Sequence, residues 1–234
     1  MAAHYPTIRG VGAMQGAAGS ITHTIGGTSG ISEQGDLILI FLESANEAFT
    51  AVTGYLQAPS SPQSLGTAAA ANATRLTIFY KFADGTETTY VTGDSGDHNA
   101  VGSLVIRGVD RVNPFNANAG DTAAAPGGVA PFISTCPAVT TTVPECMIII
   151  AVATDYDANS TAVFSNPTNA NLTSLTERID GTTAQQDGGG LGVFTGLKAT
   201  AGSTGTTTVT QVASEETARI TLALAPLRRR IATT

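Results

Sequence analysis

Two groups of side chains in this chain have residue types that bind divalent cations. The first, Asp155, Asp157 and Asn159, follows the D-x-D-x-N spacing with which a calcium loop begins. That loop also requires Gly at its sixth position and a bidentate Glu at its twelfth, where this chain has Ser160 and Asn166. The favoured interpretation is therefore an exposed loop rich in Asp and Asn, with calcium binding as the alternative.

The second group, Asp94, Asp97 and His98, overlaps a Gly-Asp-Ser-Gly tetrapeptide at residues 93–96. It offers either a cation site at a loop tip or the nucleophile loop of a chymotrypsin-type protease. A catalytic triad has to be recognised by several groups at once. Asp97 stands where that protease family has Gly, and no histidine stands in an Ala-Ala-His-Cys sequence. We interpret the segment as a polar turn between strands, and we expect a protein that is not an enzyme and has no metal or cofactor.

The charge balance argues against nucleic acid as a partner. The chain carries a formal net charge of −7, and only 12% of its 234 residues are charged, whereas phosphate binding needs clustered Lys or Arg. The one basic cluster is Arg228, Arg229 and Arg230, close to the C-terminal end. It is interpreted either as a solvated tail or as an arm that docks on an acidic partner surface.

The cysteines and the apolar runs indicate in which cellular compartment the protein is made. Cys136 and Cys146 do not make a disulfide framework, and Cys146 opens an apolar run in which it is expected to be a small buried side chain. A cross-strand disulfide between the two is the alternative. The longest apolar run, residues 147–153, is too short to span a bilayer, and no segment has the pattern of a signal peptide. We therefore expect synthesis in the cytoplasm and no membrane contact.

The elements that have to position these residues follow a pattern that occurs twice. Each half has a nearly continuous apolar run, then a second apolar strand, a Gly-containing turn, a Thr-rich run and a final apolar strand. In the first half these segments are 37–42, 76–82, 83–85, 86–91 and 100–109, and in the second half they are 146–152, 191–197, 201–205, 206–212 and 217–225. Alternation in residues 76–82 and the Asp84-Gly85 turn are typical of a β-hairpin.

This pattern predicts an all-β protein, a two-sheet antiparallel β-sandwich of jelly-roll-like type with about eight strands from two similar halves. Two small sheets need each other to bury their apolar faces, so we expect the two strand sets to interleave and neither half to close a core alone. Residues 1–19 are predicted to form an extended N-terminal arm, residues 20–226 a single sandwich domain and residues 227–234 a C-terminal tail. The arm, the tail and the unmatched loops at 45–75 and 155–190 are the expected places for function.

Three aromatic residues in predicted loops are the candidates for exposed contacts. They are Tyr55, Phe115 and Tyr156, and local packing is the alternative for each. The chain has no Trp, which argues against the exposed aromatic platforms on which carbohydrate-binding sandwiches hold sugar rings.

Three segments, Gln34–Leu42, Tyr80–Gly85 and Arg107–Asn116, resemble a β-sandwich module common in the virion proteins of tailed bacteriophages. The resemblance covers most of the chain, and its most specific parts are fold signatures, so it implies an architecture and a structural role rather than a site. Such modules serve as capsid decoration or cement proteins, head fibres and parts of tail fibres, and they are commonly oligomeric, often trimeric. This chain has no coiled-coil heptads and no long fibrous repeat, which favours a compact decoration protein.

The resemblance implies a capsid decoration or cement protein on the surface of the virion. Its partners would be neighbouring major capsid proteins, across which it binds, and further copies of itself. The alternative, from a different class, is a receptor- or carbohydrate-binding module of a head or tail fibre.

Overall fold

The protein is built almost wholly of antiparallel strands. The structure, a computed structural model, describes residues 4–159 and 162–227. The first half contains β1 (Thr7–Ala17), β2 (Thr22–Thr24), the 3-10 turn η1 (Ile25–Gly27), β3 (Leu37–Ser44), β4 (Leu56–Gln57), β5 (Gln63–Leu65), β6 (Thr74–Phe82), β7 (Thr89–Val91) and β8 (Asn99–Arg107). The second half contains β9 (Phe115–Ala123), β10 (Phe132–Cys136), β11 (Thr140–Thr141), β12 (Cys146–Thr154), β13 (Phe164–Thr168), β14 (Thr173–Thr183), β15 (Gly189–Lys198), β16 (Gly202–Ser203), β17 (Thr207–Gln211) and β18 (Thr217–Leu224). The all-β prediction is confirmed.

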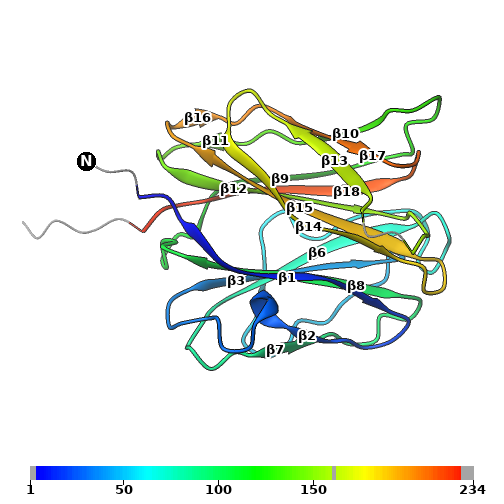
Figure 1. Cartoon of the computed structure of the whole chain (residues 1–234), viewed down its shortest axis with the longest axis horizontal. Coiled ribbons are helices and arrows are strands. Elements are labelled where there is room, and N and C mark those ends of the chain that lie inside the picture. The colour runs from blue at the N-terminus through cyan, green and yellow to red at the C-terminus, as the bar shows by residue number, and fades with distance from the viewer. Residues whose placement is uncertain (1–3, 160–161, 228–234) are drawn as a thin grey trace, which may run out of the picture.

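Each half forms a main sheet of its own. The first has the strand order β1-β8-β3-β6-β4, with β5 also paired to β6, and the second has the order β14-β15-β12-β18-β9. The smaller sheets β2-β7 and β10-β17-β13 lie outside them, so that the layers stack from β2 and β7 at the bottom of Figure 1 to β10, β13 and β17 at the top. The predicted sandwich of antiparallel sheets is confirmed. The prediction that strands of the two halves interleave is wrong, because each main sheet contains strands of one half only.

The strands of each half pair as a long hairpin that is rolled up. In the first half the pairs are β1 with β8, β2 with β7 and β3 with β6. The second half repeats them as β9 with β18, β10 with β17 and β12 with β15. A further pairing, β3 with β8 and β12 with β18, rolls each hairpin into two layers. The duplication therefore extends to every strand pair of the hairpin, while a single jelly roll shared by both halves is not confirmed.

Three hydrophobic clusters lie between the layers. One cluster is shared by the two main sheets. A second draws only on the first half and lies between its main sheet and the β2-β7 layer, and a third draws only on the second half. The expectation that neither half encloses a core is therefore wrong. Because both faces of the main sheets are covered along their central strands, every residue of β3, β12 and β18 is buried. This explains why β3 and β12 are nearly continuous apolar runs in the sequence.

The sequence predicts an N-terminal arm that lies outside the sandwich. The structure instead includes most of this segment in the first main sheet. Residues 7–17 form β1, which pairs with β8 along the edge of the first main sheet. At the other end of the chain, Val109 forms an isolated bridge with Pro226, and the amide of Leu227 donates to the carbonyl oxygen of Gly108 at 2.6 Å. The described part of the predicted tail is therefore attached to the first half.

Buried polar contacts clamp one end of the first main sheet. Asp36, just before β3, is 1% exposed and accepts hydrogen bonds from Nε and Nη2 of Arg107 at 2.9 and 3.2 Å. Its main chain joins the β3–β6 hairpin, because the amide of Ala83 donates to the carbonyl oxygen of Asp36 at 2.8 Å. Glu33 binds the same guanidinium at 2.6 Å. The clamp thus connects the start of β3, the end of β6 and the end of β8.

Candidate functional site at the seam between the halves

The predicted contact residue Tyr55 lies in the core of the first half. Its side chain is only 8% exposed, and its ring packs edge-on against Tyr90, with 5.1 Å between the ring centroids. The prediction that Tyr55 is exposed for a partner is therefore wrong. Although it lies in a loop, the β2-β7 layer covers that loop.

We expect the Tyr55→Phe variant to be as stable as the wild-type protein or more stable, with a gain of up to about 1 kcal/mol in the free energy of unfolding. The reason is that the buried hydroxyl of Tyr55 has no hydrogen-bond partner in the described chain, so the substitution removes an uncompensated polar group and keeps the ring. Chemical denaturation measures the difference, with Tyr90→Phe as the neighbouring control. A loss of more than 1 kcal/mol in the Tyr55 variant would show that the hydroxyl is bonded.

The other predicted contact residues have mixed positions. Phe115 begins β9 instead of lying in a loop; it is half-buried and packs edge-on against Tyr80, with 4.9 Å between the centroids. Tyr156 is half-buried and packs against the core of the second half. Their role as contacts stays a prediction. Arg228, Arg229 and Arg230 lie outside the described residues.

The Gly-Asp-Ser-Gly tetrapeptide does not bring a serine to an imidazole. The hydroxyl of Ser95 donates to the carbonyl oxygen of His98 at 2.9 Å and also contacts Asn99. The His98 ring is fully buried, with Nε2 2.9 Å from Oε2 of Glu43 and Nδ1 2.9 Å from Oδ1 of Asp97. The segment is therefore a turn fixed by a buried His–carboxylate network, and His98 is not at a loop tip.

No metal centre is found in the described ranges: no three His, Cys, Asp or Glu side chains there could together hold an ion. The same ranges contain no helix long and apolar enough to cross a membrane. Cys136 and Cys146 are both buried and are not joined in a disulfide, and burial raises the pKa of Cys136 to about 12. The buried position predicted for Cys146 is confirmed.

Asp155 lies in the segment that the sequence predicts to be an exposed loop rich in Asp and Asn. It is instead a buried carboxyl group without full hydrogen bonding, so that prediction is wrong for Asp155. It is 4% exposed, and its Oδ1 has no hydrogen-bond partner in the described chain. Burial, followed by the charge of Glu215, raises the pKa of Asp155 to about 7. Because an unfolded Asp has a pKa near 3.9, the folded state holds its proton more strongly. This carboxyl therefore lowers stability as the pH rises from about 4 through 7.

We expect the Asp155→Asn variant to be more stable than the wild-type protein at pH 8, by about 1–3 kcal/mol. The amide keeps a hydrogen-bonding oxygen but carries no charge into the buried site. At pH 4 the advantage should disappear, because the wild-type carboxyl is then protonated. Denaturant unfolding at both pH values measures it, with Asp157→Asn as the control, and a destabilised variant at pH 8 would contradict the assignment.

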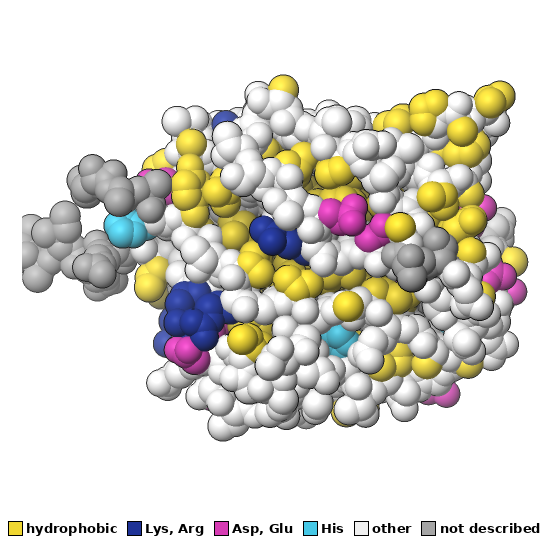
Figure 2. Space-filling model, in the orientation of Figure 1, with side chains coloured by type: hydrophobic (Ala, Val, Ile, Leu, Met, Phe, Trp, Pro, Cys, Tyr) yellow, Lys and Arg dark blue, Asp and Glu magenta, His cyan; other side chains and the backbone are white. Residues whose placement is uncertain are grey.

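A hollow lies at the seam where the edges of the two main sheets meet. Figure 2 shows hydrophobic side chains along this line around one basic group, with acidic side chains beside them, between the strands that Figure 1 labels β1 and β14. The two edge strands run in the same direction. A Cβ atom on Gly16 would lie 2.3 Å from the side chain of Thr183, and one on Gly181 would lie 3.4 Å from Met14. Glycine is thus required at position 16, where the seam is closed, whereas the space at Gly181 would accept a Cβ atom.

At the other end of the seam the strands separate around a pocket of about 420 Å³. Irregular pairing contributes to the separation: β14 shifts register between Thr173 and Thr176, and Ser174 has a φ of 52°. β1 also shifts between Ile8 and Gly10. The pocket is lined by residues from the N-terminal segment and from β1, β12, β14 and β15: Tyr5, Pro6, Thr7, Ile8, Met147, Ser174, Arg178, Thr195 and Leu197.

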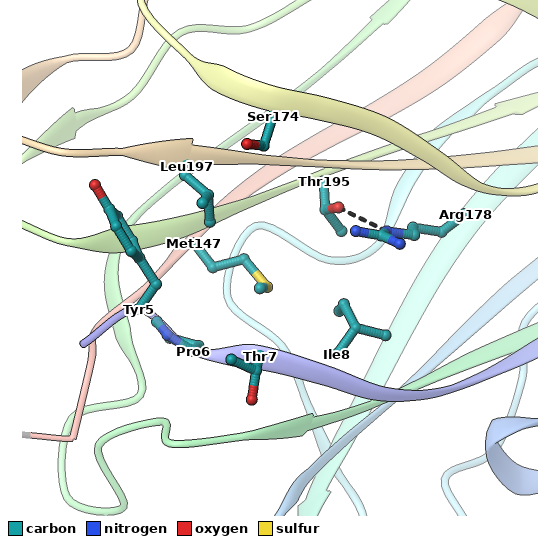
Figure 3. A pocket seen from close by; sticks show the side chains of 9 residues that line it. All are labelled: Tyr5, Pro6, Thr7, Ile8, Met147, Ser174, Arg178, Thr195 and Leu197. Atoms are coloured by element: carbon teal, nitrogen blue, oxygen red, sulfur yellow. Dashed lines mark hydrogen bonds between the residues drawn. The ribbon is translucent and has the colours of Figure 1, made fainter. Parts of the chain in front are cut away.

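The pocket combines an apolar floor with one cation. Figure 3 shows the side chains of Ile8, Met147 and Arg178 pointing into the same space. Nε of Arg178 donates to Oγ1 of Thr195 at 2.9 Å, which fixes the plane of the guanidinium. None of these lining residues was singled out from the sequence. Arg178 lies in a segment interpreted from the sequence as a loop. The pocket exists only because four segments that are separate in the sequence meet.

Comparisons with protein-family models, with curated proteins and with solved structures gave no match to this chain.

Proposed function

We propose that this protein is a structural virion protein of tailed bacteriophages, a capsid decoration or cement protein. In this role it binds across neighbouring major capsid proteins on the capsid surface, stabilises the shell and performs no catalysis. It associates with further copies of itself, and a trimer is the expected form. The rolled hairpin in each half supports jelly-roll connectivity within the halves.

The observation that carries the proposal is the meeting of the three segments that resemble phage virion modules. Gln34–Leu42, Tyr80–Gly85 and Arg107–Asn116 are far apart in the sequence, yet the buried clamp described above joins residues from all of them. A sequence signature of a fold consists of residues that hold its structural elements together, and these residues hold one end of a sheet together. Their arrangement supports reading the resemblance as one of architecture, from which the structural role is inferred.

The position of the chain ends supports a docking role. A Cβ atom on Gly108 would lie 3.8 Å from Pro6, and the Gly108 carbonyl oxygen binds the amide of Leu227. The first and last described residues therefore leave the sandwich on the same side (Figure 1). Contacts made near both ends would fall on the same neighbouring molecule.

The layered core supports a role under mechanical load. The central strands of the main sheets are covered on both faces, with hydrophobic clusters between the layers. A capsid under internal pressure requires a rigid binder of this kind, since tight packing leaves little room to deform.

A receptor- or carbohydrate-binding module is the second candidate, and the pocket at the seam is the observation that favours it. Ligand sites are commonly concave and combine apolar with polar groups, and this pocket likewise has both apolar and polar lining residues.

The number of copies per purified virion separates the two candidates. A cement protein should be present in numbers comparable with the major capsid protein, and particles that lack it should release their DNA at lower temperature while still adsorbing to host cells. Adding the purified protein back should restore the release temperature. A copy number comparable with tail proteins, together with lost adsorption, would sink the cement proposal and support the receptor-binding one.

A further inference from the structure

We infer that the pocket at the seam binds a carboxylate carried on a small apolar body, with Arg178 as the residue that holds the carboxylate. This inference concerns the purified protein and does not depend on the proposed role in the capsid. The geometry that points to it is the combination of an oriented guanidinium, an apolar floor and a volume of about 420 Å³.

The guanidinium of Arg178 has donors left for a ligand. Its Nε is used by Thr195 at 2.9 Å, and within the described ranges no carboxylate lies at ion-pair distance from it. Three other arginines, Arg9, Arg107 and Arg219, each pair with a carboxylate of the chain. Arg75 is also partly buried, and no carboxylate of the described residues pairs with it, but only Arg178 of the two lines the pocket. In a protein with a net charge of −7, the pocket position makes Arg178 the arginine that an external anion can reach.

The shape of the donor set selects a carboxylate. A guanidinium presents two parallel N–H groups that match the two oxygens of a carboxylate. Phosphate, with more charge, is usually bound by several cations or by main-chain amides, and the pocket lining contains only one basic side chain. Thr7 and Ser174 also line the pocket, and neither carries a charge.

The apolar side chains of the pocket determine which ligand group next to the carboxylate would bind well. Ile8, Met147 and Leu197 bring aliphatic and thioether groups to the pocket. Burying a short branched alkyl group against them removes apolar surface from water and so favours binding. The apolar surroundings also strengthen the ion pair with Arg178, because screening by water is reduced there. A hydrophilic carboxylate such as acetate gains only the second of these contributions.

Two sources offer this chemistry: a free branched carboxylic acid and the C-terminal carboxylate of a polypeptide that ends in an apolar residue. The test uses 4-methylpentanoate for the first and N-acetyl-Ala-Leu with a free carboxylate for the second. The uncharged comparison is 4-methylpentanamide. Tighter binding of the peptide identifies a polypeptide end as the source, and tighter binding of the simple acid identifies a free metabolite; both support the inference.

The methionine methyl groups report binding without any substitution. The chain has three Met residues; Met147 lines the pocket, and Met14 contacts Gly181 at the closed part of the seam. In the full-length protein labelled with ¹³C at the methionine methyl groups, titration with either acid should shift the Met147 signal in a saturable way and leave the Met14 signal in place. An unmoved Met147 signal at millimolar probe, or an equal shift with the amide, would overturn the inference.

Substitution of the arginine tests its role. Arg178→Gln should weaken binding of the acid at least about tenfold, because a charge-assisted pair is lost, and Arg178→Lys should recover part of it. Arg111→Gln, at an exposed arginine outside the pocket, is the matched control and should bind as the wild-type protein does. Unchanged binding by a folded Arg178→Gln variant would also overturn the inference.

Discussion

Replacing His98 by Ala is expected to destabilise the protein by about 3–5 kcal/mol. His98 and Glu43 are both fully buried and lie 2.9 Å apart. Removing one partner of a buried pair leaves the other charged group without compensation, which is the costly case for such pairs. Glu43 keeps only the hydroxyl of Thr74, at 3.2 Å. Denaturant unfolding at pH 7 measures the loss.

A double variant separates the cost of the orphaned charge from the value of the pair. Glu43→Gln combined with His98→Ala should be more stable than His98→Ala alone, because no carboxylate is then left buried. If the double variant loses as much as the sum of the two single variants, the groups act independently and the coupling is absent.

The same pair predicts how stability changes with pH. Burial alone would lower the pKa of His98, but the charge and hydrogen bond of Glu43, with those of Asp97, outweigh burial and raise it to about 9. The unfolded value is near 6.5, so the stabilisation by the protonated ring is complete below pH 6.5 and is lost as the pH rises through 9. His98→Ala should therefore differ from the wild-type protein far less at pH 10 than at pH 6.

The second large effect is expected from the Phe194→Ala variant, with a loss of about 3–5 kcal/mol. Phe194 on β15 is fully buried and packs edge-on against Phe164 of the outer layer, with 6.4 Å between the ring centroids. Truncating it leaves a cavity between the second main sheet and the β10-β17-β13 layer.

This variant tests whether the second half has a core of its own. Val112→Ala, at a position that is 82% exposed, should change stability by less than about 0.5 kcal/mol and serves as the control. Unfolding followed by circular dichroism measures both variants. A loss below 1 kcal/mol for Phe194→Ala would mean that the outer layer is not packed on the main sheet.

The apolar and Thr-rich runs predicted the central strands and their hairpin partners, whereas the edge strands β1, β9 and β14 were not predicted. Residues 146–152 predict β12 because a run without polar positions suits a strand covered on both faces. The edge strands lack this signal. β9, whose residues 116–120 are Asn-Ala-Asn-Ala-Gly, and the Gly-containing β1 have few β-branched side chains, so strand propensity was low there. Pairing with β18 and β8 stabilises them regardless.

The layer arrangement was missed for a related reason. A fully apolar strand shows that both faces are covered, but it does not show by what. The short strands β2 and β7 supply that cover in the first half, and only three residue pairs join them, too few to leave a periodic pattern. The pocket at the seam was unpredictable in the same way, because Arg178 acquires its surroundings from strands that are distant in sequence.

The rolled hairpin in each half also sets the order in which the chain can fold. Its pairs are nested, with β3 and β6 inside β2 and β7, and these inside β1 and β8. Closing the inner pair brings the next strands together, so zipping outward is cheaper in chain entropy than closing the outermost pair first. Because nearly all pairing is non-local, we expect refolding on the scale of milliseconds to seconds or slower. β1 and β9 pair last, and until then the unpaired edges of β8 and β18 are the surfaces through which two incompletely folded chains would join.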